Sequence, residues 1–482
     1  MPRLNSQRRT KIIATLGPAT DSEEKMAQII AAGVDLVRLN FSHGLHEEHK
    51  RRIELVRRVA QQQQKIIGIL VDLQGPKIRI ASFKNKKIHL KEGDTFILDA
   101  NLDENAGDET VVGIDYKELV NDVMPRDVLL LDDGRIMFIV EKVEGSKIIC
   151  RVEVGGELSS HKGINRQGGG LSAKALTEKD KNDMQFALAM GVDYIAISFP
   201  RNAADIQEAR SLMSQTQTKA SIIAKIERAE ALAAIDEIIE ASDGVMVARG
   251  DLAVEIGDAE VPVAQKEIIH QARTLNKPVI TATQMMESMI TSTVPTRAEV
   301  SDVANAVLDN TDAVMLSAET AVGEHPAKVV SAMARVCVVA EQQRHAQLSR
   351  HRVECTFERI DEAIAMATMY AANHLDIKAI VTLTESGTTP LWMSRIRTGI
   401  PIYGLSRNVK TLGKMTLLRG VYPLAFDVTA CSRDEVNIAA VKVLEDREVV
   451  HEGDKVILTK GDHAGVGGGS NAMKILVVGK VL

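Results

Sequence analysis

Polar side chains close a series of apolar, strand-like runs, and their chemical types limit the reactions they can support. In a strand, residues i and i+2 point to the same face, and several runs end in polar residues at that spacing. These are Arg38, Asn40 and Ser42; Lys225 and Glu227; Arg249 and Asp251; Thr281 and Thr283; and Ser317 and Glu319, with Asp72 closing a further run. One such pair could be a structural ion pair. Five pairs indicate a site, because charges clustered without a ligand would leave desolvated groups to be compensated.

These residue types favour an anionic substrate and a hard metal ion. Arg can bind phosphate or carboxylate through two parallel hydrogen bonds, and the cations available are Arg38, Lys225, Arg249 and Arg79. Glu227 and Asp251 could hold Mg²⁺, which takes one or two protein carboxylates and completes its shell from water and phosphate oxygens. The set contains no His or Cys, which disfavours zinc hydrolysis and a thiol nucleophile. What remains is metal-assisted chemistry on a phosphorylated or carboxylated compound.

Eight apolar runs that alternate with helical patterns would position these residues. The runs are KIIATLG (11–17), VDLVRLNF (34–41), IIGILVDL (66–73), VDYIAISF (192–199), SIIAKIE (221–227), DGVMVARGD (243–251), KPVITATQ (277–284) and DAVMLSAE (312–319). Continuous apolarity is typical of parallel strands buried on both faces. The pattern predicts an α/β protein with a (β/α)8 barrel, whose catalytic residues converge at the C-terminal ends of the strands.

The chain divides into three predicted domains. Residues 1–75 and 173–343 would form the catalytic barrel. Residues 76–172 show short alternating runs and little helical periodicity, so they would form a small inserted β-barrel domain, a lid whose flanking glycines act as hinges. Residues 344–482 would form a smaller C-terminal α/β domain with a regulatory role. Its GVGGGS segment precedes a strand-like run instead of a helix, which predicts a loop and not a dinucleotide site.

The composition excludes several classes of protein. The 482 residues are 45% hydrophobic and 26% charged, which is typical of a soluble globular protein. An aromatic share of 3% and a net charge of -6 disfavour nucleic acid as a partner. The four cysteines lie far apart, which predicts reduced thiols. No run approaches the ~20 apolar residues of a membrane span, and no secretion signal is evident, so a cytoplasmic protein is expected.

Longer strings around these residues resemble one enzyme family. VRLNFSHG, GPKIR, IIAKIE, MVARGDL, ATQMMESM and PTRAEVSDVANAVLDNTDAVMLSAET closely resemble pyruvate kinases, and the likeness covers almost the whole chain in order. The resemblance implies the barrel, the inserted β domain and the C-terminal domain. It also implies glycolytic transfer of the phosphoryl group of phosphoenolpyruvate to ADP, giving pyruvate and ATP, with Mg²⁺ or Mn²⁺ as cofactor and a homotetrameric assembly.

The resemblance further implies roles for individual residues. Lys225 would neutralise the transferring phosphoryl group, and Glu227 and Asp251 would ligate Mg²⁺. Gly250 would let backbone amides approach the substrate carboxylate, and Thr283 would polarise the proton donor on the opposite face of the enolate. The other assignments are Arg38 and Arg79 at the phosphate, Ser317 and Glu319 in a proton-delivering network, Arg249 as an ion-paired brace of the rim, and Arg79 with Lys179 near ADP.

The segment around Lys77 resembles the bacterial-type branch of the family that works without K⁺. In K⁺-dependent members the ion is bound at the positions of Asn40, Ser42, Asp72 and the carbonyl of Leu73, and Glu stands at the position of Lys77. Here a fixed ammonium could supply the charge that the ion otherwise brings. The sequence therefore predicts activity that does not require K⁺.

A hydroxyl-rich segment in the C-terminal domain resembles the effector phosphate loop of the family. It consists of Thr384, Glu385, Ser386, Gly387, Thr388 and Thr389, follows a predicted strand and offers hydroxyls and amides shaped for phosphate. Glu385 stands where relatives activated by fructose-1,6-bisphosphate often have Lys, and its charge would oppose a second phosphate. The expected effector is a monophosphorylated metabolite such as AMP or a sugar phosphate.

Two other functions fit parts of the pattern. A barrel lyase or aldolase that acts on 2-oxo acids with Mg²⁺ would use a similar rim, but it would need neither the inserted lid nor ADP. A metabolite sensor would keep the phosphate loop without catalysis. A sensor, however, has no use for a phosphoryl-transfer cation such as Lys225 together with metal ligands.

Overall fold

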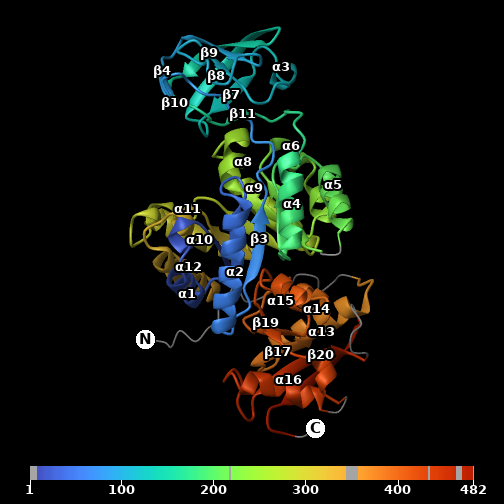
Figure 1. The fold of residues 1–482 in the computed structure, drawn as a ribbon. Coiled ribbons are helices and arrows are strands. Elements are labelled where there is room, and N and C mark those ends of the chain that lie inside the picture. The colour runs from blue at the N-terminus through green and yellow to red at the C-terminus, as the bar shows by residue number, and fades with distance from the viewer. Residues whose placement is uncertain (1–7, 217–218, 344–355, 433–434, 463–468, 481–482) are drawn as a thin grey trace.

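The computed structural model describes residues 8–216, 219–343, 356–432, 435–462 and 469–480. They form a central barrel with a strand-rich insertion at one end and an α/β domain at the other (Figure 1). The expected fold class is confirmed, because eight parallel strands close into a barrel and further sheets lie on either side of it. Among the described helices, none combines the length and the apolar character needed to cross a membrane.

The barrel strands are short and almost wholly buried. They are β1 (Lys11–Thr15), β2 (Leu36–Asn40), β3 (Gly68–Asp72), β12 (Tyr194–Ile197), β13 (Ser221–Ile226), β14 (Gly244–Ala248), β15 (Val279–Ala282) and β16 (Ala313–Leu316). Around the ring they run in the order β1-β16-β15-β14-β13-β12-β3-β2. Every second residue, such as Ile13, Leu70 and Met246, packs into the interior of the barrel. The residues between them join the larger core beneath the outer helices.

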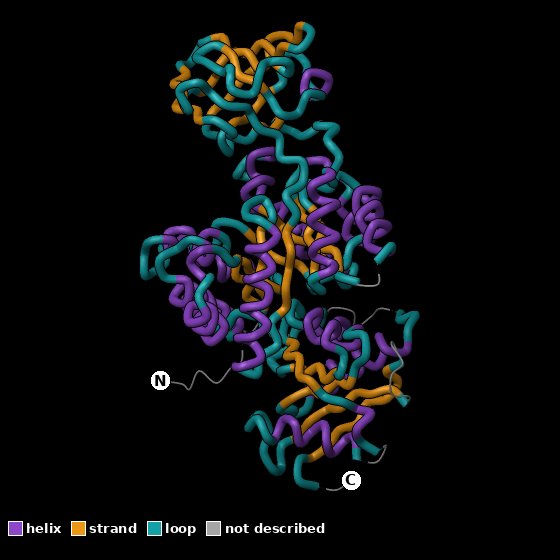
Figure 2. The backbone as a smooth tube through the Cα atoms, in the orientation of Figure 1, coloured by secondary structure: helices purple, strands orange, loops and turns teal. Residues whose placement is uncertain are grey.

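Helices cover the outside of the barrel (Figure 2). They are α1 (Glu23–Ala32), α2 (His46–Gln62), α4 (Glu178–Ala189), α5 (Ala203–Ser214), α6 (Ala229–Ala233), α7 (Ile235–Ala241), α8 (Arg249–Ile256), α9 (Val261–Thr274), α10 (Arg297–Leu308), α11 (Ala318–Ala321) and α12 (Pro326–Glu341). Local sequence sets several of their starts. The Thr177 and Asp180 side chains bond each other's backbone N–H at the start of α4, as Thr296 and Glu299 do at α10.

The insertion lies between β3 and α4 and has its own core. Its elements are β4 (Lys87–Leu90), β5 (Thr95–Asp99), β6 (Val111–Gly113), α3 (Leu119–Asp122), β7 (Val128–Leu131), β8 (Ile136–Glu144), β9 (Lys147–Val154), β10 (Gly156–Ser159) and β11 (Ile164–Arg166). They form a six-stranded sheet, β11-β7-β8-β9-β5-β6, and the pair β10-β4. Phe96 and Phe138 lie at the centre of this core, with ring centroids 5.5 Å apart.

The two segments that join the insertion to the barrel contain glycines with positive φ, at Gly75 and at Gly168 to Gly170. The barrel contacts both segments. Gly75 donates its N–H to Asp180 Oδ1 at 3.0 Å, and Arg228 Nη1 donates to the carbonyl of Leu171 at 3.0 Å. The insertion therefore meets the barrel through narrow, hydrogen-bonded connections that suit a hinge.

The C-terminal domain is a mostly parallel sheet with helices on both faces. Its elements are α13 (Ile360–His374), β17 (Ala379–Leu383), α14 (Thr388–Ser394), β18 (Ile402–Ser406), α15 (Val409–Met415), β19 (Val421–Ala425), α16 (Val436–Glu445), β20 (Lys455–Gly461) and β21 (Ser470–Val477). The strand order is β19-β18-β17-β20-β21, with only β21 antiparallel within this sheet. The expected strand after GVGGGS is confirmed as β21, while residues 465–468 lie outside the described residues.

Three cysteines are free thiols, as the sequence predicts. Burial raises the pKa of Cys150 and of Cys337 to about 12, so both stay protonated near neutral pH. Cys431 is half-buried, and Cys355 lies outside the described residues.

The base of the barrel is closed by the C-terminal domain. Leu417 reaches the interior core of the barrel, and Lys11 Nζ donates to the carbonyl of Val421 at 2.5 Å. Gly413 lies against the carboxylate of Asp193, where a Cβ atom would stand 2.0 Å from Oδ1. No larger residue fits at position 413 unless this contact moves.

We expect Asp193 to make this contact dependent on pH. Desolvation raises the pKa of Asp193 from 3.8 to about 6, although Lys410 and Arg57 oppose the shift. The folded chain therefore holds this proton more tightly than the unfolded chain, and the contribution of Asp193 to stability falls as pH rises from 3.8 to about 6. Asp193→Asn should stabilise the protein more at pH 7.5 than at pH 5, by about 1–2 kcal/mol. Melting midpoints of both proteins at the two pH values measure this, and an equal difference at both would contradict it.

Candidate active site

Five side chains from neighbouring strands form a connected polar layer inside the C-terminal mouth of the barrel. They are Thr15 from β1, Arg38 from β2, Asp72 from β3, Ser198 just after β12, and Lys225 from β13. Arg38 Nη1 donates to Thr15 Oγ1 at 3.1 Å, and Arg38 Nη2 lies 2.7 Å from Asp72 Oδ2. These residues meet because each occupies an inward-facing position near the end of its strand.

Lys225 is the centre of this layer. Its Nζ lies 2.8 Å from Glu227 Oε1 and 3.2 Å from Asp72 Oδ1, and it donates to Ser198 Oγ at 2.8 Å. The residue is 9% exposed. Three partners on different strands hold the ammonium group in one position, so it can face a substrate anion without first reorganising.

The charges of this layer shift one another's pKa values. Burial alone would lower the pKa of Lys225, but Asp72 and Glu227 outweigh burial and the pKa is raised, so the ammonium stays charged. Burial would raise the pKa of Asp72, but Lys225 and Arg38 lower it. Burial raises the pKa of Glu227 to about 7; Lys225 opposes this shift and Asp251 adds to it. Of the two carboxylates that contact Lys225, Glu227 is therefore the one whose pKa is raised.

Glu227 and Asp251 fit the ligand set of a divalent cation. Glu227 is 1% exposed and accepts the N–H of Phe199 at 2.9 Å, while Asp251 is half-buried at the start of α8. The Asp251 charge raises the pKa of Glu227, and a dication bound to both carboxylates would offset that repulsion. Within the described residues no three His, Cys, Asp or Glu side chains cluster as a metal site. Mg²⁺ typically takes one or two protein carboxylates and completes its shell from substrate and water.

Lys77 forms an ion pair with Asp251, one of these two carboxylates. It lies on the segment that leads from β3 into the insertion, and its Nζ is 3.6 Å from Asp251 Oδ1. The other predicted monovalent-cation positions are already engaged within the protein. Asn40 Oδ1 accepts the N–H of Ser42 at 3.1 Å, and the carbonyl of Leu73 accepts Ser198 Oγ at 2.6 Å.

Thr283 lies beside Gly250 across the mouth of the barrel. The N–H of Gly250 donates to Thr283 Oγ1 at 2.9 Å, and that hydroxyl donates to the carbonyl of Ala282 at 2.7 Å. The backbone of Thr283 is left-handed, with φ 69°, so β15 ends there and the side chain turns toward α8. The amide of Gly250, expected to approach the substrate, is bonded to Thr283 in this structure.

The expected brace at Arg249 is confirmed. Its Nη1 and Nη2 bind the two carboxylate oxygens of Asp302 at 2.6 and 2.9 Å, and Nη2 also donates to the carbonyl of Thr283 at 2.6 Å. Arg249 therefore ties the start of α8 to α10 and to the end of β15. Its guanidinium is committed to protein partners and holds Thr283 in place.

Ser317 and Glu319 follow β16 and contact each other. Glu319 is 2% exposed, and its Oε2 accepts the N–H of Ser317 at 2.6 Å while Oε1 accepts the N–H of Met286 at 3.2 Å. The carboxylate thus fixes the loops after β15 and β16 side by side, next to Thr283.

Three predicted positions lie apart from this layer. The expectation that Thr281 faces the site together with Thr283 is wrong. Its side chain is fully buried outside the interior of the barrel and donates to Thr311 Oγ1 at 3.0 Å. Arg79 belongs to the insertion, where its Nη1 donates to the carbonyl of His161 at 2.9 Å. Lys179 is held on α4, with Nζ 2.6 Å from Asp183 Oδ2.

The structure adds Ser198 and Thr15, which the sequence reading did not select. Ser198 contacts Lys225 and Leu73 directly, and Thr15 contacts Arg38. The two-residue alternation could have selected Ser198, because it follows Ala196 by two residues at the end of an apolar run. A single hydroxyl among apolar residues is common in buried strands, so it did not stand out.

The hydroxyl-rich segment of the C-terminal domain forms a tight turn between β17 and α14. The N–H of Gly387 donates to Thr384 Oγ1 at 2.9 Å, and the hydroxyls of Ser386 and Thr388 lie 2.8 Å apart. Gly387 adopts φ 82° at the start of α14. Glu385 is paired with Arg407, with Oε1 and Nε 3.4 Å apart.

Comparison with known proteins agrees along almost the whole chain. The family model of the pyruvate kinase barrel domain matches residues 7–330, and that of the pyruvate kinase alpha/beta domain matches residues 362–476. The chain is 55% identical to pyruvate kinase II of Salmonella typhimurium over 477 residues, 98% of this chain and 99% of the relative. It is 54% identical to pyruvate kinase of Haemophilus influenzae over 459 residues, 94% and 96% of the two chains. Pyruvate kinase of Geobacillus stearothermophilus is 41% identical, over 99% of this chain and 81% of its own length.

Proposed function

Because the chain belongs to the pyruvate kinase family of phosphotransferases, we propose that it transfers the phosphoryl group of phosphoenolpyruvate to ADP. The observation that carries this proposal is the position of Lys225, a charged ammonium held by Asp72, Glu227 and Ser198 inside the mouth of the barrel. In phosphoryl transfer the protein acts mainly by positioning the reactants and stabilising charge. A cation held in one position can both orient a phosphoryl group and stabilise its charge.

In this proposal Lys225 and Arg38 bind the phosphoryl oxygens and neutralise the charge that develops during transfer. Asp72 keeps both cations in place, since its two carboxylate oxygens contact one cation each. Thr283 lies across the mouth and orients the proton donor for the enolate, while Ser317 and Glu319 connect it to the network behind. Arg79 would join from the insertion when this lid closes.

Glu227 and Asp251 are the proposed ligands of Mg²⁺ or Mn²⁺. The bound ion would supply Lewis-acid stabilisation of the enolate and of the phosphoryl oxygens. Glu227 suits this role because burial and the nearby charge of Asp251 raise its pKa to about 7, and a bound cation would offset both effects. Lys179 and Arg79 are proposed for the ADP side, with residues 76–172 as the lid over the catalytic barrel of residues 1–75 and 173–343.

The reaction is tested by its products. We expect ATP and pyruvate to form in equal amounts from phosphoenolpyruvate and ADP with Mg²⁺, measured in the same quenched samples. A lyase would form a 2-oxo acid without ATP, and a sensor would form neither. Release of inorganic phosphate in place of ATP would contradict the proposal.

We also propose that the activity does not need K⁺, because Lys77 already provides a fixed ammonium 3.6 Å from Asp251. The rate in Na⁺ or Tris salts should stay within about twofold of the rate in K⁺. Lys77→Glu should lower the rate about fivefold in Na⁺, on the scale of one partly exposed ion pair, and the variant should regain part of that rate with K⁺. Lys84→Glu is the matched control, since Lys84 pairs with Asp108 at 3.9 Å within the insertion. A large stimulation of the wild type by K⁺ would overturn this proposal.

We further propose that residues 384–389 bind the phosphate of a monophosphorylated activator, AMP or a sugar phosphate. The turn presents hydroxyls and the amides at the start of α14, while Glu385 adds a carboxylate that repels a second phosphate. A monophosphate should lower the phosphoenolpyruvate concentration at half-saturation about threefold to tenfold, the common scale of allosteric coupling. Ser386→Ala combined with Thr388→Ala should remove the shift. Activation by fructose-1,6-bisphosphate but not by any monophosphate is the contrary result.

A cytoplasmic homotetramer completes the proposal. In such an assembly, the contacts between subunits can couple an effector bound to one subunit to the phosphoenolpyruvate affinity of the others. Sedimentation analysis of the full chain should give a single species of four times the 52.5 kDa chain mass, and a monomer at assay concentration would exclude this part.

A further inference from the structure

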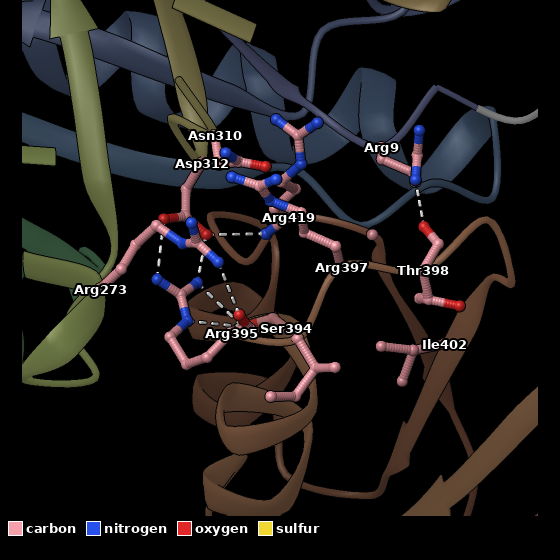
Figure 3. Close-up of a pocket in the computed structure, with 12 residues that line it drawn as sticks. Arg9, Arg273, Asn310, Asp312, Ser394, Arg395, Arg397, Thr398, Ile402 and Arg419 are labelled. Carbon is pink, nitrogen blue, oxygen red and sulfur yellow. Dashed lines mark hydrogen bonds and ion pairs between the residues drawn. The ribbon is translucent and has the colours of Figure 1, made fainter. Parts of the chain in front are cut away.

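A pocket rich in arginine lies where the base of the barrel meets the C-terminal domain, at the far end from the polar layer around Lys225. Five arginines line it: Arg9 and Arg273 from the barrel, and Arg395, Arg397 and Arg419 from the C-terminal domain. Figure 3 shows Arg273, Arg395, Arg397 and Arg419 gathered around Asp312 and Asn310. The mechanism of phosphoryl transfer uses none of them.

The positive charge of this pocket is only partly compensated. Asp312 lies within it and pairs with Arg395, and Glu341 lies 3.6 Å from Arg9 Nε and 3.9 Å from Arg419 Nη2. Among the described residues, these two carboxylates pair with Arg395, Arg9 and Arg419 of the pocket. Burial, and after it the nearby charges of Arg395 and Arg397, lower the pKa of Arg273 to about 10.

Several guanidinium donors of the pocket remain available to a ligand. Arg419 is 9% exposed, and its buried Nη2 has no hydrogen-bond partner among the residues that the structure describes. Arg273 donates from Nη2 to the carbonyl of Arg395 at 2.9 Å, and its Nε and Nη1 bond to no acceptor in the described part of the chain. Unsatisfied charged donors in a buried site are costly unless an anion completes them.

We propose that this pocket binds a phosphate-sized oxyanion, either inorganic phosphate or the phosphoryl end of a small metabolite. Guanidinium groups match the oxygens of phosphate in pairs. The free space in the pocket is small, about 20 Å³, and the pocket is partly open to solvent. This size suits the oxygens of one oxyanion and excludes a whole nucleotide. The bound anion contacts arginines of both domains and stabilises their docking.

Trp392 provides a direct signal for this binding. It is the single tryptophan of the chain, it lies on α14, and its carbonyl accepts the N–H of Arg395 at 3.2 Å. Intrinsic fluorescence therefore follows the C-terminal domain, both in binding titrations and in thermal unfolding. Neither measurement requires substrate turnover, so the result does not depend on the proposed catalytic function.

The test is a titration of the full chain with inorganic phosphate, replacing chloride at constant ionic strength. Arg273→Gln and Arg397→Gln remove one cation each at half-buried positions, and Arg447→Gln makes the same change at an exposed position in the turn after α16. We expect a saturable rise of the unfolding midpoint in the wild type and in Arg447→Gln. Affinity should fall at least about tenfold in both pocket variants, the scale of one lost bidentate contact to phosphate. Phosphate that binds at the Lys225 layer or at residues 384–389 should raise the unfolding midpoint equally in all four proteins. It therefore does not produce a difference between them.

Ribose 5-phosphate in place of phosphate separates the two sources of the anion. A response at lower concentration than with inorganic phosphate, lost in Arg273→Gln, identifies the phosphoryl end of a metabolite; an equal or weaker response identifies free phosphate. The proposal is overturned if Arg273→Gln and Arg397→Gln respond like the wild type, or if all four proteins show the same rise without saturation.

Discussion

Lys225→Met is expected to abolish phosphoryl transfer while leaving the barrel folded. Lys225 contacts Asp72, Glu227 and Ser198 together, and Met keeps most of its apolar stem. Loss of a preorganised group that stabilises developing charge lowers kcat by about 10²–10³ or more. Steady-state rates at saturating phosphoenolpyruvate and ADP measure the effect on kcat.

The same change should also alter the titration of the site, which separates a lost charge from a lost fold. Without the ammonium, Asp72 and Glu227 are left buried beside each other, so their pKa values should rise and the variant should lose stability most at high pH. Ser198→Ala is the matched control, because it removes one hydrogen bond to Nζ but keeps both ion pairs. It should keep activity within about tenfold of the wild type. Full activity in Lys225→Met would contradict the role given to this residue.

Asp312→Asn is expected to cause the largest loss of stability. Asp312 and Arg395 are each 1% exposed, and Arg395 Nη1 donates to Asp312 Oδ2 at 2.9 Å. Asp312 also accepts the N–H of Val279 at 3.0 Å and the N–H of Arg419 at 3.1 Å. Asn leaves the Arg395 charge uncompensated and points an amide donor at one of these donors, which should cost about 3–5 kcal/mol.

Urea unfolding followed by the fluorescence of Trp392 measures this loss where it acts, in the C-terminal domain. Asp309→Asn is the control in the same loop region. Asp309 is half-buried and pairs with the exposed Lys266 at 2.6 Å, so its substitution should cost less than that of Asp312, about 1 kcal/mol. The double variant Asp312→Leu with Arg395→Met should be more stable than Asp312→Asn, since it removes both buried charges. A midpoint for Asp312→Asn equal to that of the control would contradict this account of domain docking.

The barrel strands could be predicted from the sequence because each is a short apolar run bounded by turn residues. The strands after Gly68 and before Arg249 illustrate this, since both are buried along their whole length. The apolar runs alone do not predict the order of the strands around the ring. That order follows from the (β/α)8 pattern of the whole segment. The docking of the C-terminal domain could not be predicted, because Leu417 and Asp312 make their contacts only where the two domains meet.

The polar layer was predicted in part, for reasons that particular residues show. Arg38, Asp72 and Lys225 end their strands in inward-facing positions, so the two-residue alternation selected them. The same rule failed at Thr281, because Thr283 turns to φ 69° and leaves the strand while Thr281 faces the outer helices. Ser198 was missed because one hydroxyl in a strand is an ordinary buried residue until its neighbour across the sheet is known to be a lysine.

The central claim is that phosphoenolpyruvate is consumed only by transfer to ADP. The most direct measurement is the initial rate of pyruvate formation from phosphoenolpyruvate with Mg²⁺, with and without ADP, in a buffer free of K⁺. We predict rapid turnover with ADP and a rate at background without it. Equal turnover in the absence of ADP, or no turnover with ADP in either K⁺ or Na⁺, would contradict the account.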